Sequence, residues 1–199
     1  MNEAHQYCGS EQWRQMIREV ILPWALGETD LGDDVLEVGP GYGATTDVRG
    51  TVTVRLRSVE IDDDLAARLR ERFAERPSVE IINGDATRLE FADATFTGAA
   101  CFTMLHHVPT IELQDRLFAE VARVLRPGAA LVASGGLGSD DLAAAHDGDT
   151  YNPVDPASLP ERLATAGFDD VAVKTNEFGW AAIARVRPKS DGVSRPHPA

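Results

Sequence analysis

The chain has 199 residues, of which 43% are hydrophobic and 26% are charged, so its length suits one domain with a real core and not two ordinary ones. Its net charge of −13 argues against a nucleic-acid scaffold, because phosphate binding requires basic surface, although a local basic patch stays open. The N-terminus has no signal-peptide pattern and no apolar run approaches the ~20 residues that cross a bilayer, so we expect a cytoplasmic protein without a membrane partner.

The first predicted element is a helix over residues 8–26. Ser10 is a suitable N-cap, and Pro23 is expected to end or kink the helix. The apolar side chains fall on one stripe at helical spacing: Trp13, Ile17, Val20, Ile21 and Trp24. Such a stripe favours a helix that packs against the core, and a flap over a ligand pocket is the alternative.

Beyond this helix, predicted strands alternate with predicted helices. The strands cover residues 33–38, 56–61, 79–82, 97–102 and 129–133, and the helices cover 44–54, 62–76 and 113–125. Residues 44–54 are rich in β-branched side chains, but parallel strands need a crossover, so we expect a short helix there. Pro127-Gly128 should stop the helix that precedes it. This alternation predicts an open, mostly parallel α/β sheet.

The last third of the chain departs from this alternation. Residues 134–157 are loop-rich, and a short helix over 158–166 is followed by Gly167 as its C-cap. Two strands, 171–174 and 180–186, lie so close in sequence that they predict an antiparallel hairpin. Residues 188–199 are rich in Pro, Ser and Gly and are predicted to be disordered.

A glycine-rich turn follows the first predicted strand in VLEVGPGYGATT, residues 35–46. Gly39, Gly41 and Ala44 match the fingerprint of dinucleotide-binding turns, and Glu60 lies 21 residues after Gly39, where a carboxylate can hold ribose hydroxyls. A nicotinamide-dependent oxidoreductase is therefore one alternative. However, Glu37 beside the turn would repel a pyrophosphate and attract an ammonium or sulfonium group.

The glycine turn, four other segments and the C-terminal hairpin together make the chain resemble the class I S-adenosylmethionine-dependent methyltransferases. The similar segments are E-V-G-P-G-Y-G (37–43), V-E-I-D (59–62), N-G-D-A (83–86), C-F-T-M-L-H-H-V (101–108) and L-R-P-G-A-A-L-V (125–132). The resemblance implies a three-layer Rossmann-like sandwich, whose seven-stranded, mostly parallel sheet has an antiparallel last strand. It also implies one domain over residues 1–187, with residues 8–26 as a flap helix and residues 134–157 beside the acceptor.

The same resemblance assigns residues to S-adenosylmethionine by their positions in these motifs. The methionine part would contact Glu37, Gly39, Pro40, Gly41 and Gly43. Glu60 would hold the ribose, Ile61 would pack on the adenine, Asp85 and Ala86 would meet the adenine amino group, and Phe102 and Thr103 would line the sulfonium end.

The reaction implied is an in-line displacement onto a small-molecule acceptor, which needs alignment but no metal. The acidic cluster of residues 62–64 is consecutive, so its side chains fan out on a helix and predict no metal site. A general base is required only when the acceptor must lose a proton. His106 and His146 are the candidates, and His107 is a weaker one.

Two other functions remain open at this point. One is a catalytically silent, methyltransferase-like module that binds a nucleoside. The other is an enzyme like the ribosomal-RNA adenine dimethylases, whose sequences V-E-I-D-D-D-L (59–65) resembles. An N-P-P-aromatic motif is absent and the net charge is acidic, so a nucleic-acid partner is not expected. The sequence does not indicate an oligomeric state.

Overall fold

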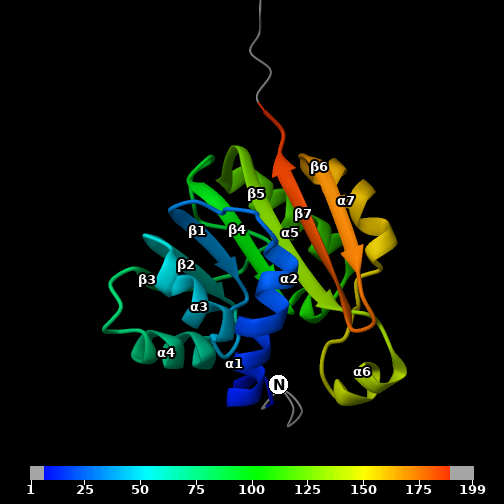
Figure 1. Ribbon diagram of the computed structural model, residues 1–199, viewed down its shortest axis with the longest axis horizontal. Helices are drawn as coiled ribbons and strands as arrows, with labels where there is room; N and C mark the ends of the chain where they lie inside the picture. Colours follow the sequence, from blue (N-terminus) through cyan, green and yellow to red (C-terminus); the bar gives the residue numbers. More distant parts are fainter. Residues whose placement is uncertain (1–6, 189–199) are drawn as a thin grey trace, which may run out of the picture.

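The computed structural model describes residues 7–188, so nearly all of the tail predicted to be disordered lies outside the described residues. The strands are β1 (Asp34–Val38), β2 (Arg55–Glu60), β3 (Val79–Asn83), β4 (Phe96–Phe102), β5 (Leu125–Gly136), β6 (Phe168–Thr175) and β7 (Gly179–Val186). They form one sheet in the order β3-β2-β1-β4-β5-β7-β6. Only β7 runs antiparallel to its neighbours in this sheet (Figure 1), which confirms the fold implied by the sequence.

Helices cover both faces of the sheet. They are α1 (Glu11–Met16), η2 (Ile17–Ile21), α2 (Leu22–Leu26), α3 (Ala44–Val52), α4 (Asp63–Arg72), η3 (Leu105–His107), α5 (Ile111–Val124), α6 (Asp140–Ala145), η4 (Pro156–Ser158) and α7 (Leu159–Ala166). Phe118 of α5 and Leu163 of α7 belong to one core, and Ile17 belongs to the other. Successive side chains of β4 alternate between the two, with Cys101 in the first core and Phe102 in the second.

The strand order places a crevice at one edge of the sheet. The chain continues from β1 towards β2 and β3 on one side, whereas β4 and β5 lie on the other side of β1. Val38 at the end of β1 pairs with both Val59 of β2 and Cys101 of β4. The loops that follow these three parallel strands therefore leave the sheet side by side, at the position where open α/β sheets bind ligands.

The N-terminal helix begins as predicted but does not end at Pro23. Ser10 caps it by accepting a hydrogen bond from the Trp13 N–H (3.1 Å). The turn before Pro23 is π-helical, and the Leu22 N–H donates to the carbonyl of Ile17, five residues back. This wider turn accommodates the proline, and the helix continues to Leu26.

Two other expectations about the chain need comment. The crossover helix is confirmed as α3 in spite of its β-branched residues, because the parallel pairing of β1 with β2 requires a crossover. The helix predicted before Pro127-Gly128 is confirmed as α5, which ends at Val124, but β5 begins at Leu125, earlier than predicted, and includes these two residues. They fall beside the register shift between Phe96 and Gly98 of the neighbouring strand, where a proline is tolerated.

The segment over residues 134–157 is less irregular than its sequence predicts. It contains the short helix α6, capped by Ser139, which accepts from the Leu142 N–H (3.2 Å).

Among residues 7–188, none of the helices has both the length and the apolar character of a membrane span.

Candidate functional site

The glycine turn between β1 and α3 needs glycine for two different reasons. Gly41 and Gly43 both have positive φ angles, 56° and 79°. A Cβ on Gly43 would lie 2.8 Å from Leu69 Cδ2, so this glycine lets α4 pack against the turn. A Cβ on Gly41 would meet no atom within 4 Å, so open space lies above its backbone. A ligand can therefore approach the turn at Gly41.

Glu60 joins the end of β2 to this turn. One carboxylate oxygen accepts from the Gly41 N–H (3.0 Å), and the other accepts from the Asp62 N–H (3.0 Å). The residue is only 4% exposed. Burial raises the pKa of the Glu60 carboxyl, although the backbone hydrogen bonds from Asp62 and Gly41 oppose the rise. The carboxylate thus fixes two loops at the edge of the crevice.

Glu37 is buried beneath the turn and does not line the pocket described below. A single oxygen of its carboxyl group accepts hydrogen bonds from the hydroxyls of Thr46 (2.7 Å) and Ser58 (2.6 Å). The residue is 2% exposed, and desolvation raises its pKa to about 7 in spite of these bonds. Glu37 therefore connects β1 to β2 and α3 from inside the protein.

A pocket of about 290 Å³ opens above the carboxyl ends of β1, β2 and β4. Seven of the residues predicted from the sequence line it: Gly39, Pro40, Gly41, Glu60, Ile61, Phe102 and Thr103. Ile61 is 69% exposed, so its apolar side chain is available to a flat ligand. Trp13 and Ile17 also line the pocket, and Ile17 is in the core as well. The N-terminal helix therefore packs on the core and borders the pocket at once.

The other predicted residues lie around this pocket without lining it: Glu37, Gly43, Asp85, Ala86, His106 and His146. One oxygen of Asp85 accepts from the N–H and the hydroxyl of Thr87 (2.8 Å each), and Ala86 is buried in the core. His107, the weaker candidate base, also lines the pocket, whereas sequence reasoning assigned no role to the lining residues Tyr42, Met104, Asp149 and Thr150. Tyr42 and Met104 stand next to recognised motif residues, whereas nothing in the sequence marks Asp149.

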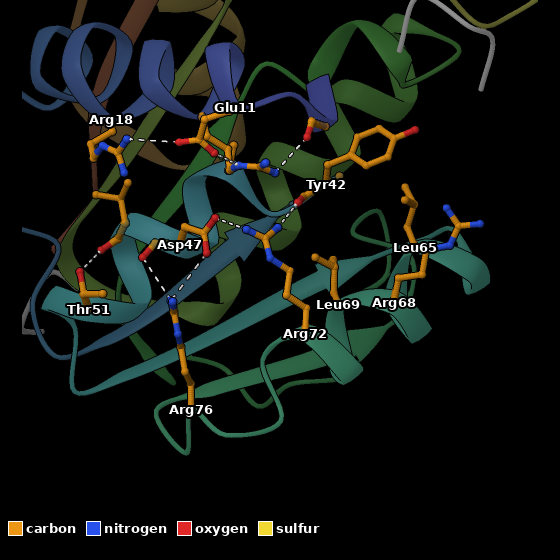
Figure 2. A pocket seen from close by; sticks show the side chains of 15 residues that line it. Glu11, Arg18, Tyr42, Asp47, Thr51, Leu65, Arg68, Leu69, Arg72 and Arg76 are labelled. Carbon is orange, nitrogen blue, oxygen red and sulfur yellow. Dashed lines mark hydrogen bonds and ion pairs between the residues drawn. The ribbon is translucent and has the colours of Figure 1, made fainter. Parts of the chain in front are cut away.

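A second, larger pocket of about 750 Å³ lies next to the first and shares Gly41 and Tyr42 with it (Figure 2). Five arginines line it, from α1, η2 and α4 and the turn after α4: Arg14, Arg18, Arg68, Arg72 and Arg76. Glu11 pairs with Arg14 (2.9 Å) and Arg18 (3.7 Å), and Asp47 pairs with Arg72 and Arg76. Five cations against two anions leave three positive charges on an otherwise acidic protein.

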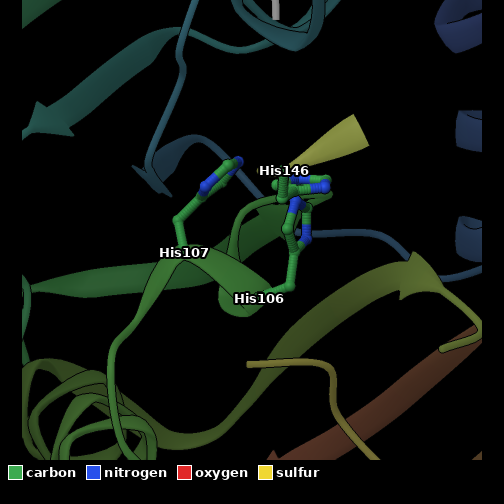
Figure 3. A group of neighbouring side chains, drawn as sticks. All are labelled: His106, His107 and His146. Atoms are coloured by element: carbon green, nitrogen blue, oxygen red, sulfur yellow. The ribbon is translucent and has the colours of Figure 1, made fainter. Parts of the chain in front are cut away.

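Three histidines lie next to one another (Figure 3), and one of them, His107, lines the first pocket. His106 and His107 are neighbours on η3, and His146 is the C-cap of α6. The ring of His106 lies 4.1 Å from that of His107 and 4.9 Å from that of His146, measured between centroids. The sequence suggested His106 and His146 as separate candidates, and the structure places them in one group with His107, which lines the pocket.

Comparison with known proteins gives three concordant results. Residues 36–133 match the family model described as a methyltransferase domain. The chain is 31% identical over 181 residues to a probable S-adenosylmethionine-dependent methyltransferase of Mycolicibacterium smegmatis, covering 88% of this chain and 66% of that protein. The fold resembles that of the PH0226 protein of Pyrococcus horikoshii, with a TM-score of 0.78, 21% identity, and coverage of 94% of this chain and all (100%) of that one.

A shorter similarity links the chain to RNA-modifying enzymes. The ribosomal RNA small subunit methyltransferase A of Acidobacterium capsulatum is 45% identical over 58 residues. This match covers 29% of the chain and 20% of that protein. The chain thus spans 66% of the length of the M. smegmatis relative and one fifth of the A. capsulatum one.

The buried carboxyl of Glu37 makes a prediction about stability. Its pKa of about 7 in the folded protein is above its ordinary value of 4.5, so the folded state is favoured at low pH. This contribution is complete below pH 4.5 and is lost as pH rises through 7. The loss amounts to about 3 kcal/mol of unfolding free energy, since one pKa unit corresponds to about 1.4 kcal/mol.

Glu37→Gln keeps an oxygen for Thr46 and Ser58 but cannot ionise. We therefore expect the stability of this variant, relative to wild type, to increase by about 3 kcal/mol between pH 4 and pH 8 in urea unfolding. Glu60 also has a raised pKa, but it is present in both proteins and cancels in the comparison. Parallel pH profiles for the two proteins would contradict the prediction.

Proposed function

Because this chain belongs to the class I S-adenosylmethionine-dependent methyltransferases, we propose that it transfers the methyl group of that cofactor to a small-molecule acceptor. The observation that carries the proposal is the bond between Gly41 and Glu60 at the edge of the pocket. It joins an open glycine turn to a carboxylate, opposite Phe102 and Thr103. A ligand with a charged amino-acid end and a nucleoside end matches this arrangement.

The residues of the pocket fit such a donor. The backbone of Gly39, Pro40 and Gly41 offers close approach to its methionine part. A carboxylate has about four acceptor sites, so Glu60 can hold two backbone N–H groups and still accept from ribose hydroxyls. Exposed Ile61 can cover the face of the adenine.

Two residues predicted to bind the donor, Glu37 and Gly43, act without touching it in this proposal, and Asp85 and Ala86 lie at its adenine end. Glu37 and Gly43 shape the glycine turn from below. Asp85 uses one carboxylate oxygen for Thr87, so we propose that its other oxygen accepts from the adenine amino group, beside Ala86.

When bound, the cofactor supplies an electrophilic methyl group on a sulfonium that is already activated as a leaving group. The protein then has to align the acceptor and exclude water. Phe102 and Met104 provide an apolar wall at the proposed methyl end, and Trp13 lines the same pocket. His106 and His146 stand where a proton could be accepted, if the acceptor is a hydroxyl or an acidic carbon.

Calorimetric titration tests donor binding directly. We expect S-adenosylhomocysteine to bind with a dissociation constant of about 1–100 μM and NAD not to bind, because a pyrophosphate finds no cation among the residues that line the first pocket. Binding of NAD without binding of S-adenosylhomocysteine would make the chain a nicotinamide-binding protein. Donor binding without turnover against any acceptor would support the silent nucleoside-binding module.

Substitution of Glu60 tests the ribose contact. Glu60→Ala should weaken binding of S-adenosylhomocysteine about 10- to 100-fold, because a hydrogen bond to a charged group contributes about 1.5–3 kcal/mol. Glu80→Ala removes an exposed carboxylate from the neighbouring strand and serves as the matched control. Circular dichroism checks that both variants fold. Equal affinities in the two variants would show that the ribose is held elsewhere.

A nucleic-acid acceptor is the second candidate, and the arginine pocket is the observation that favours it. Its three excess positive charges could contact phosphates, and one relative is named as a ribosomal RNA methyltransferase. That similarity covers 29% of the chain, and the similarity to a protein of the same name from Parasynechococcus marenigrum covers 55% of it. The net charge of −13 opposes association with a long polyanion.

An RNA-binding assay separates the two acceptor classes. With a small-molecule acceptor, a fluorescent RNA hairpin should bind no tighter than about 10 μM at 150 mM salt, and Arg68→Ala should not change this. Arg55→Ala, an exposed arginine at the start of β2, is the matched control. Tighter, salt-dependent binding that Arg68→Ala weakens and Arg55→Ala does not would favour the nucleic-acid acceptor.

A further inference from the structure

The three histidines form a group of metal-ligand type in the part of the chain that the structure describes. Each imidazole of His106, His107 and His146 offers one nitrogen, and these three nitrogens all lie within 4.8 Å of one another. We propose that these residues bind one divalent transition-metal ion of the zinc type at the acceptor side of the pocket. The acidic cluster of residues 62–64 contributes no ligand to this proposed site.

The spacing of the nitrogens is close to what a metal ion requires. Around a tetrahedral zinc with Zn–N bonds of 2.0–2.1 Å, ligand nitrogens lie about 3.4 Å apart. Side-chain rotations that shorten the nitrogen–nitrogen distances by up to about 1.4 Å bring the three nitrogens to that spacing. Figure 3 shows the ring of His107 directed towards those of His106 and His146, so no ring has to be turned around to join the group. The centroids of His107 and His146 are 5.3 Å apart.

The hydrogen bonding of His146 suits a ligand. Its Nδ1 lies 2.6 Å from the carbonyl oxygen of Leu142. A carbonyl can only accept, so Nδ1 carries the proton and Nε2 keeps its lone pair. Metal-binding histidines commonly donate their other N–H to a backbone carbonyl in this way, which fixes both the tautomer and the ring orientation. The Nε2 atom is buried and therefore lies inside the protein, away from solvent.

The two segments that carry the histidines are fastened together. The backbone N–H of Asn152 donates to the carbonyl of His106 (2.7 Å), and its side chain donates to that of Val108 (3.0 Å). Gln114, which is 1% exposed, donates to the carbonyls of Leu105 and Asn152 (3.0 Å each). These bonds hold the loop after His146 against η3 before any ion binds, which reduces the entropy cost of forming the site.

Two further features point to an ion with a water or another small ligand. Tyr151 stacks on His146 at 4.7 Å, and within residues 7–188 its buried hydroxyl has no hydrogen-bond partner. A metal-bound water would give that hydroxyl a partner. His107 lines the pocket, so an ion held by the three histidines would lie beside the pocket, and three protein ligands leave one position open in catalytic zinc sites. Neutral imidazoles favour zinc, cobalt, nickel or copper over magnesium.

The site also bears on the acceptor. An oxygen or nitrogen of the acceptor would take the open position, and this part of the inference rests on the proposed function, whereas ion binding does not. A bound ion uses the lone pairs that His106 and His146 would need as general bases. The two roles therefore exclude one another, and metal binding decides between them.

The test uses tag-free full-length protein treated with a chelator and then titrated with Zn²⁺ by calorimetry and with Co²⁺ by visible absorption. We expect one equivalent of Zn²⁺ with a dissociation constant below about 10 μM, and the intense visible bands of four-coordinate Co²⁺. His146→Gln and His107→Gln should each weaken Zn²⁺ binding more than about 100-fold, beyond the roughly 10- to 100-fold that loss of a ligand's hydrogen-bond partner costs. The double variant Asp63→Asn/Asp64→Asn is the matched control and should bind Zn²⁺ as wild type does.

Titration of each variant with S-adenosylhomocysteine reports whether the fold and the donor pocket are intact. Zinc binding weaker than about 10 μM in the wild type would overturn the proposal, as would unchanged binding in both histidine variants or loss of binding in the aspartate variant. A protein that binds zinc but not S-adenosylhomocysteine would keep the metal site and reject the proposed function. The reverse result would keep the proposed function and reject the metal site.

Discussion

The position of the glycine turn depends on two carboxyl groups that lie side by side at the ends of β1 and β2. Glu37 accepts from Thr46 and Ser58 inside the protein, and Glu60 accepts from the N–H of Gly41 at the surface of the pocket. Their burial is unfavourable for a charged group, and the raised pKa of each expresses that cost. The protein retains them because together they join β1, β2 and α3 at the point where a ligand must approach the backbone.

Most of the donor side could be predicted from the sequence because its signals are local. A strand, a glycine turn and a carboxylate after the next strand follow one another along the chain, and parallel pairing brings them to one edge. The role of Glu37 could not be predicted in the same way. Its charge beside the turn suggested direct ligand contact, which stays a prediction, whereas its bonding to Ser58 and Thr46 depends on the pairing of β1 with β2 and on the position of α3.

The acceptor side could not be predicted because it depends on contacts between distant segments. His146 lies 40 residues after His106, and what joins them is the bonding of Asn152 and Gln114 to η3, for which the sequence has no pattern. The arginine pocket likewise combines Arg18 with Arg76, 58 residues apart, on an acidic chain whose average charge argues against such a patch. Composition describes the whole surface, whereas binding depends on where charges gather.

The five arginines and the three histidines flank the donor pocket on different sides, so they would contact different parts of an acceptor. The arginine pocket shares Gly41 and Tyr42 with the donor pocket but not Phe102 or Thr103. His107, by contrast, lines the donor pocket together with Phe102 and Thr103. In the proposed donor orientation the methyl group faces the latter pair. The histidine group thus stands at the reacting end, and the arginines stand behind the methionine part. In that orientation the imidazoles are the side chains placed to act at the methyl group, and the arginines are placed to contact a part of a ligand that extends away from it.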